Sequence, residues 1–162
     1  MTNDTIGSPE TIPTPDTIAT PDERIALVKE YFRKVDTGAT DLFDMFAEDA
    51  QVFFPGFGVA RGKSEILKMV VGLSSALSTF EHDESRMTFT QDNNRLVVEG
   101  AEAGTFVDGK PFPGDARSGG LFCSVFEFEG TLFSRMHIYA DPDLAGQRPA
   151  LFTWDSATSN EK

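Results

Sequence analysis

The chain has 162 residues, the length of a single domain. Apolar residues make up 40% and charged residues 25%, proportions typical of a folded globular protein and not of a fibrous or disordered chain. The 26 acidic and 14 basic side chains leave a formal net charge of −12, and such a surface repels nucleic acid and anionic lipid. We therefore expect neither a nucleic acid nor a membrane as a partner.

Cysteine usage and hydropathy predict a cytoplasmic protein. Cys123 is the only cysteine, so the chain cannot form an intrachain disulfide, and a reducing compartment fits best. No segment approaches the roughly 18 apolar residues of a membrane span, and the first residues lack the basic and apolar regions of a signal peptide. Because the cysteine and two histidines are too few for a metal cluster, we expect no metal, and we expect no cofactor.

The first residues repeat one hexapeptide three times, at 5–10, 11–16 and 17–22. This proline-rich composition has too little apolar surface to offset the entropy of ordering, and it predicts a disordered arm over residues 1–19. The Ser-Pro and Thr-Pro steps are either phosphorylation or docking sites, or parts of a plain tether. We expect one folded domain over 20–146 and a tail over 147–162.

Apolar spacing predicts three helices at the start of the domain. Thr20 and Glu23 have the spacing of a capping box, and apolar residues then recur at intervals of three and four. The predicted segments are a helix from Pro21 to Gly38, a short helix through Leu42, Met45 and Phe46, a strand over 51–54, and a helix from about 63 to 77.

The period then changes to that of strands. We predict strands at 87–90, 96–107, 121–128 and 132–139. The turn sequences at 93–94 and 129–130 predict tight hairpins, whereas the turn at 108–109 continues into a longer loop. Helices followed by strands indicate an α+β domain in which an antiparallel sheet curls around a helical layer. A ligand site is expected at the mouth between the two layers.

Five segments resemble the SnoaL-like branch of the nuclear transport factor 2-like superfamily, which includes ketosteroid isomerase, limonene epoxide hydrolase and scytalone dehydratase. They lie at 20–23, 42–50, 61–66, 103–109 and 136–142, so the resemblance spans about 20–146. It implies a cystatin-like α+β roll: a cone-shaped, curved antiparallel sheet wrapped around three N-terminal helices and a deep apolar pocket. It also implies a homodimer formed through the outer face of the sheet.

The resemblance assigns roles to particular positions. Tyr31 matches the tyrosine of the ketosteroid isomerase oxyanion hole, but Phe54 stands where that family has its general base, and Ser124 stands near its protonated aspartate. His82 and Asp36 match a catalytic histidine and a first-helix aspartate of scytalone dehydratase. The histidine type suits proton transfer, because its ordinary pKa lies near neutrality.

Two further positions depend on which sheet face turns inward. Glu99 and Glu102 point to opposite faces of one strand, and a glutamate buried among phenylalanines would have a raised pKa. His137 shares a face with Arg135 and Tyr139, which lines either the pocket or an interface. The candidate catalytic residues are His82, Tyr31, His137, Asp36 and Glu99, and the candidate substrate-binding residues are Phe54, Phe57, Ser124, Phe126 and Tyr139.

The resemblance and these candidates together predict a cofactor-independent acid/base enzyme. The expected reaction is dehydration or isomerisation of a hydrophobic cyclic metabolite such as a polyketide, terpenoid or steroid. The alternative is a non-catalytic domain of the same fold that binds a small molecule or another protein, since polar catalytic positions of the relatives are occupied by phenylalanine here.

Overall fold

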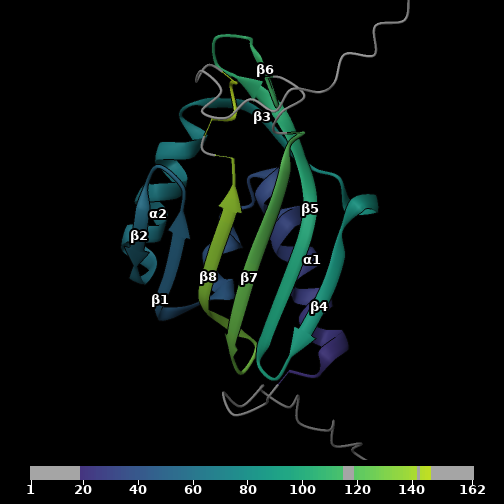
Figure 1. Ribbon diagram of the computed structural model, residues 1–162. Coiled ribbons are helices and arrows are strands. Elements are labelled where there is room, and N and C mark those ends of the chain that lie inside the picture. Colours follow the sequence, from purple (N-terminus) through teal and green to yellow (C-terminus); the bar gives the residue numbers. More distant parts are fainter. Residues whose placement is uncertain (1–18, 115–118, 142, 147–162) are drawn as a thin grey trace, which may run out of the picture.

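The computed structural model describes residues 19–114, 119–141 and 143–146 (Figure 1). Residues 1–18 of the predicted arm and the whole predicted tail, 147–162, lie outside this part. The elements are α1 (Pro21–Thr37), η1 (Thr40–Met45), β1 (Phe46–Phe54), β2 (Gly58–Arg61), α2 (Gly62–Ser74), β3 (Leu77–His82), η2 (Glu84–Arg86), β4 (Thr88–Asp92), β5 (Arg95–Phe106), β6 (Pro111–Phe112), β7 (Leu121–Glu129) and β8 (Leu132–Ala140). No described helix is long and apolar enough to cross a membrane.

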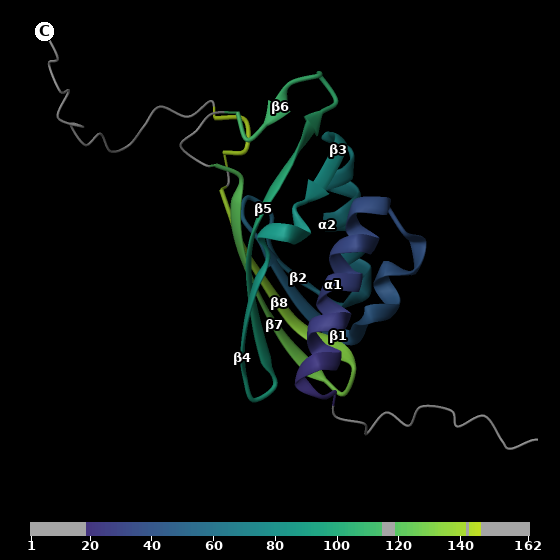
Figure 2. The ribbon, with the colours of Figure 1, turned by 90° about the vertical axis from the view of Figure 1, so that its right-hand side faces the viewer.

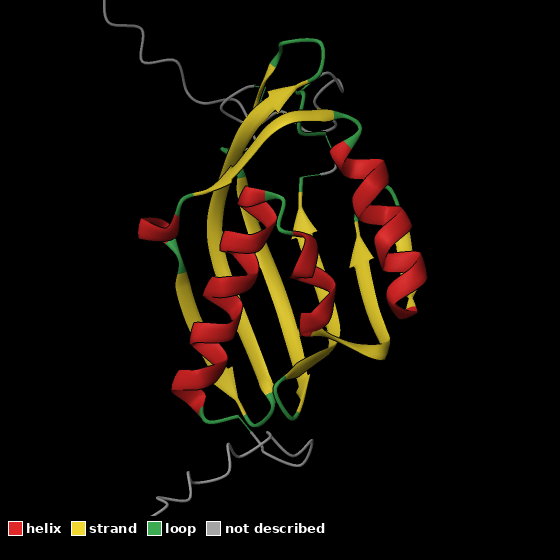
Figure 3. Ribbon diagram, turned by 180° about the vertical axis from the view of Figure 1, so that it is seen from behind, coloured by secondary structure: helices red, strands yellow, loops and turns green. Residues whose placement is uncertain are grey.

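One curved sheet forms a layer against which the helices pack. The strand order is β2-β1-β8-β7-β5-β3, and β4 and β6 also pair with β5. Strand β5 is long enough to pair with β4 through its first half and with β3 through its second half. Seen from the side, β3 leaves the plane of the other strands and lies beside the helices (Figure 2). The two α-helices cover the same face of the sheet (Figure 3), as expected for an α+β cone.

The first helix begins and ends as predicted. The Thr20 side chain accepts a hydrogen bond from the Glu23 backbone, and the Glu23 carboxylate accepts one from the Thr20 backbone, which completes the capping box. Gly38 closes the helix in the left-handed region, at φ 63°, where a residue without a Cβ is favoured. The two predicted hairpins are confirmed: a turn at 93–94 joins β4 to β5, and a turn at 130–131 joins β7 to β8.

The structure corrects four expectations about the elements. The sheet is mixed, because β1 pairs in parallel with β8, its sequence-distant neighbour. The predicted third helix stops at Ser74, and the chain from Leu77 forms β3 because its backbone pairs with β5. The short second helix is a 3-10 helix, and β1 already begins at Phe46. After the turn at 108–109 the chain forms the two-residue strand β6, which pairs with β5, and the longer loop begins only after β6.

The aromatic core fills one end of the cone. Alternate residues of β7 point inward, and Phe126 and Phe128 pack against Phe133 of β8. Val28, in the N-terminal half of α1, and Leu96 of β5 are fully buried in the same cluster. The opposite end, beside the C-terminal half of α1, is not filled by side chains.

Candidate functional site

A cavity of about 880 Å³ occupies this open end. It lies between the C-terminal half of α1, the helix α2 and the inward faces of strands of the sheet. Most of its lining is apolar, including Met136 and Ile138 of β8. Polar side chains interrupt this apolar wall, and those of Tyr31, Asp36, His82 and Glu102 are among them.

Asp36 holds His82 at two points. Its Oδ1 lies 2.6 Å from the ring Nδ1, and its Oδ2 accepts a hydrogen bond from the His82 backbone N–H at 3.1 Å. The carboxylate comes from the last turn of α1, and the histidine comes from the last residue of β3. Because Nδ1 donates its proton to a carboxylate, the neutral ring carries its lone pair on Nε2. This arrangement makes Nε2 the nitrogen available as a base.

The imidazole of His82 is fixed in an aromatic environment. Its side chain is 5% exposed, and its ring centroid lies 4.5 Å from that of Phe32, 4.7 Å from that of Phe80 and 5.3 Å from that of Phe122. These rings leave little freedom of rotation to a group that is already held by two contacts to Asp36. The imidazole of His82 is therefore held in one orientation at the wall of the cavity.

Glu102 lies directly opposite His82 in the β3–β5 ladder. Its Oε2 is 3.9 Å from Nε2 of His82, and its side chain is only 3% exposed. Burial first, and then the negative charge of Asp36, together raise the pKa of Glu102 from 4.5 to about 7. A carboxyl group with this pKa is populated in both its acid and its base form near neutral pH.

The fourth of these polar residues, Tyr31, lies in α1, more than one helical turn before Asp36. Its ring packs edge-on against Phe32, Phe46, Phe126 and Phe133, which fixes the direction of the hydroxyl. Burial, and then the charges of Glu102 and Asp36, raise the pKa of this phenol far above its ordinary value. No hydrogen bond from the Tyr31 hydroxyl to a described residue is found. The group therefore stays protonated and is available as a donor to a ligand.

The expected substrate-binding residues divide into two groups. Phe54 and Ser124 line the cavity. Phe126 is fully buried behind Tyr31, and it belongs to the core. Phe57 is 51% exposed in the connection between β1 and β2, and Tyr139 is 52% exposed on the outer face of the sheet. These last three are absent from the cavity lining.

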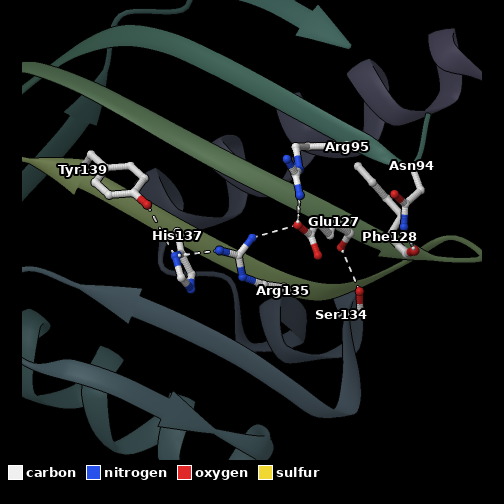
Figure 4. A network of polar contacts seen from close by, with 8 residues as sticks. All are labelled: Asn94, Arg95, Glu127, Phe128, Ser134, Arg135, His137 and Tyr139. Carbon is white, nitrogen blue, oxygen red and sulfur yellow. Dashed lines mark hydrogen bonds and ion pairs between the residues drawn. The ribbon is translucent and has the colours of Figure 1, made fainter. Parts of the chain in front are cut away.

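His137 and Glu99 lie outside the cavity, on the outer face of the sheet. Along β8, Met136 and Ile138 turn inward, so His137 turns outward together with Arg135 and Tyr139 (Figure 4). Arg135 donates a hydrogen bond to Nδ1 of His137 at 2.9 Å. Burial and the nearby Arg135 charge lower the pKa of His137. The structure does not bring this histidine or Glu99 together with Asp36 and His82.

An ion-paired network continues from His137 along the outer face. Oε1 of Glu127 accepts hydrogen bonds from Arg95 and from Arg135, each at 2.7 Å (Figure 4). Burial acts to raise the pKa of Glu127, but the hydrogen bonds and charges of these arginines outweigh it and lower the pKa. The carboxylate is thus held in its ionised form, a role consistent with fixing the sheet surface.

The sequence favoured Glu99 as the candidate catalytic glutamate of β5, whereas Glu102 is the glutamate of that strand that lines the cavity. The available signal was parity: Glu102 shares a face of β5 with the buried Leu96 and Val98. That signal was weak, because Val97 gives the other face an apolar residue too. The register that sets Glu102 beside His82 depends on β3, which was not predicted as a strand.

The polar groups are not arranged to hold a metal ion. Asp36 and Glu102 approach opposite ring nitrogens of His82, so their oxygens do not converge on one point. No group of three or more metal-ligating side chains is found in the part of the chain that the structure describes. The arrangement instead suits proton transfer, with a carboxylate, an imidazole and a second carboxyl in sequence.

A scan against protein-family models finds no match, and no curated protein matches. Solved structures do match. An NTF2-like protein from Anabaena variabilis is 20% identical over 80% of this chain and 97% of its own, with a TM-score of 0.63. A protein from Sinorhizobium meliloti whose name proposes polyketide cyclase activity is 24% identical over 70% of this chain and 94% of its own, with a TM-score of 0.56.

A third match is TerC, which was crystallised together with polyporic acid. It is 14% identical over 74% of this chain and 92% of its own, with a TM-score of 0.60. At these identities the likeness establishes the arrangement of helices and strands and leaves the chemistry to the site. The curved sheet, the helical layer and these neighbours agree, and the chain has the nuclear transport factor 2-like fold.

Proposed function

We propose that the cavity is the active site of a cofactor-independent acid/base enzyme, a dehydratase or isomerase of the SnoaL-like type. The observation that carries the proposal is the row Asp36, His82 and Glu102 in an apolar cavity, with Nε2 of His82 facing a carboxyl whose pKa is about 7. Strongly perturbed titratable groups that cluster in a cavity favour a functional role. The substrate is a hydrophobic cyclic metabolite such as a polyketide, terpenoid or steroid.

His82 removes the proton in this proposal. Its Nε2 takes a proton from the carbon next to a substrate carbonyl, while Asp36 orients the ring and stabilises the imidazolium that forms. The electrons of the broken C–H bond move onto the carbonyl oxygen. Tyr31 donates a hydrogen bond to that oxygen as its negative charge develops, in surroundings from which water is largely excluded.

Glu102 supplies the acid that dehydration requires. In its protonated form it gives a proton to the hydroxyl on the neighbouring carbon. The enolate electrons form a C=C bond and restore the carbonyl as the C–O bond breaks, and water leaves. The enzyme then holds an imidazolium and a carboxylate only one strand spacing apart, and transfer of one proton from His82 to Glu102 restores the starting state. In an isomerisation, His82 would return the same proton to a different carbon, and Glu102 would act by its charge.

Two of the structural neighbours support this reading. One has a name that proposes polyketide cyclase activity, and another was crystallised with polyporic acid, a small organic molecule. The large cavity of this chain suits a hydrophobic small molecule, because its walls are mainly apolar and a few polar groups converge within it.

The proposal is tested by incubating purified protein with metabolite extracts and comparing the products by mass spectrometry. Wild type should convert a compound to one lighter by one water or to an isomer, and His82→Ala should not. A matched control is His137→Ala, which removes the other histidine from the outer face and should leave conversion intact. Native mass spectrometry of the purified protein identifies any retained ligand.

The alternative function makes a different prediction in the same experiment. A carrier domain would retain an unchanged ligand, and wild type and His82→Ala would yield identical product profiles. That result would overturn the enzymatic proposal and favour binding alone.

We also propose that the outer face of the sheet pairs with a second copy of the chain. This face carries half-buried Phe53 beside His137, exposed Leu121 and Tyr139, and the arginine–glutamate network around Glu127. A surface with both charges and apolar side chains can complement itself about a two-fold axis. Sedimentation should give a dimer for wild type and a monomer for Tyr139→Glu; a monomeric wild type would contradict this proposal.

A further inference from the structure

The charged groups that line the cavity are mainly acidic. Asp36 and Glu102 lie within it, and the exposed Glu81 adjoins it from β3. Among the described residues, Lys34 is the single lysine or arginine in the lining, and its Nζ forms an ion pair with Oδ2 of Asp41 at 2.7 Å. The positive charge of this lysine is therefore already compensated by a neighbouring carboxylate.

The helices add to this negative potential. The residues of α1 and α2 that line the cavity include the C-terminal end of each helix, whereas their first residues, Pro21 and Gly62, lie outside the lining. A helix carries partial negative charge at its C-terminus and partial positive charge at its N-terminus. The N–H groups at the starts of α1 and α2, where an α-helix would hold an anion, therefore do not face this cavity.

We infer that the cavity accepts uncharged or cationic ligands and rejects molecules that would place a carboxylate or phosphate inside it. This inference rests on the proposed function for the position of the substrate, and it narrows the substrate class. An anion in the cavity would lose its hydration and lie beside carboxylates of the same sign, without an uncompensated lysine or arginine in the described lining.

Neutral polar groups fit the same site better. The Tyr31 hydroxyl and the buried Ser124 hydroxyl both border the cavity, and each can donate a hydrogen bond to a carbonyl or hydroxyl oxygen. The ionised form of Glu102 can accept a hydrogen bond from a hydroxyl or an ammonium group. The lining thus offers partners for ketones, alcohols and amines, but its carboxylates oppose an anionic group.

Three fluorescent probes with one apolar body test the inference: 1-pyrenemethanol, 1-pyrenemethylammonium and 1-pyrenecarboxylate. Their affinities are measured by fluorescence anisotropy at mildly alkaline pH, where Glu102 is ionised. The alcohol and the ammonium should bind, and the carboxylate should bind at least about tenfold more weakly than the alcohol, as expected for like charges in a poorly solvated site. Ile138→Trp, which fills the cavity from β8, should weaken the binding of the alcohol and the ammonium.

Two matched variants separate the cavity charge from the overall charge of the protein. Glu102→Gln should reduce the discrimination against the carboxylate by about threefold or more. Glu99→Gln removes the same charge from the outer face of the same strand, and it should leave the discrimination unchanged. Circular dichroism of each variant establishes that it is folded.

Equal affinity of wild type for the alcohol and the carboxylate would overturn the inference. So would an equal effect of Glu99→Gln and Glu102→Gln, or the absence of saturable binding by all three probes. Failure of this inference can be told apart from failure of the proposed function, because probe binding and turnover are measured separately. His82→Ala should abolish turnover but preserve the difference in affinity between the alcohol and the carboxylate.

Discussion

His82 and Glu102 are directly paired residues of two antiparallel strands, and Nε2 of the imidazole lies 3.9 Å from Oε2 of the carboxyl. The backbone register of β3 and β5 fixes this relationship, since each side chain points inward from a hydrogen-bonded ladder. The proposed base and the proposed acid are thereby held together by the sheet itself. The third member, Asp36, is added from α1 and positions the imidazole.

Replacing Asp36 by asparagine should reduce turnover on the order of 100-fold or more, because the amide no longer stabilises the imidazolium or fixes the proton on Nδ1. Nitrogen-15 NMR of the His82 ring should report a changed tautomer even before a substrate is known. The control is Asp44→Asn, an exposed aspartate of η1. Equal effects of the two substitutions on the ring spectrum would refute a positioning role for Asp36.

The stability of the Glu102→Gln variant relative to wild type should increase as the pH rises. The pKa of Glu102 is about 7 in the folded protein and near 4.5 in the unfolded chain, so between these values the folded protein binds more protons. Wild type therefore loses stability as the pH rises from about 4.5 through 7, by an amount on the order of 3 kcal/mol. Glutamine has no such loss.

The measurement is urea denaturation of wild type and Glu102→Gln at several pH values. The difference in unfolding free energy should move in favour of the variant between acid and alkaline pH. Glu99→Gln, on the outer face of the same strand, serves as the control and should show no comparable trend. A pH-independent difference for Glu102→Gln would show that this carboxyl is not desolvated as the structure implies.

The sequence supported the prediction of the helices and the main strands because local patterns determine them. The capping box at Thr20 and Glu23 fixed the start of α1, and Gly38 fixed its end. The pairing of β1 with β8 is different, since these strands are far apart in the sequence and no local pattern indicates their contact. Only the folded sheet brings them together.

The candidate site shows the same limit. Tyr31, Asp36 and His82 were named from their sequence positions, and all three line one cavity. Glu102 was weighed against Glu99, but only Glu99 was chosen as a candidate, because the choice depends on which face of β5 turns inward. Its pairing with His82 further requires β3, a strand whose polar residues make it resemble a loop in sequence.

Tyr31→Phe should reduce turnover on the order of 100-fold while changing the unfolding free energy by less than about 1 kcal/mol. The hydroxyl donates to no described residue, so its removal breaks no hydrogen bond within that part of the protein, and the aromatic packing of the ring is preserved. Kinetics and urea denaturation measure the two effects. Tyr139→Phe makes the same chemical change outside the cavity and should leave turnover intact; a matching loss there would remove the case for Tyr31.

Gly104 is expected to be essential for the pairing that holds the site together. It lies opposite Phe80 of β3 and opposite Phe112 of β6, so three strands meet at this residue. A Cβ at this position would collide with the carbonyl oxygen of Thr79 and with the ring of Phe112. Gly104→Ala should therefore lower the unfolding free energy by about 1–3 kcal/mol and displace β3 from β5.

Gly72→Ala is the same substitution with the opposite expectation. Its added Cβ would lie 3.1 Å from the ring of Phe57, which is half exposed and free to move. Because alanine favours a helix interior over glycine by about 1 kcal/mol, the variant should be as stable as wild type or more so. Urea denaturation of both variants, with amide exchange to locate the opened strands, checks the pair. If Gly104→Ala matched Gly72→Ala in stability and protection of β3, the close approach of the three strands would not constrain the site.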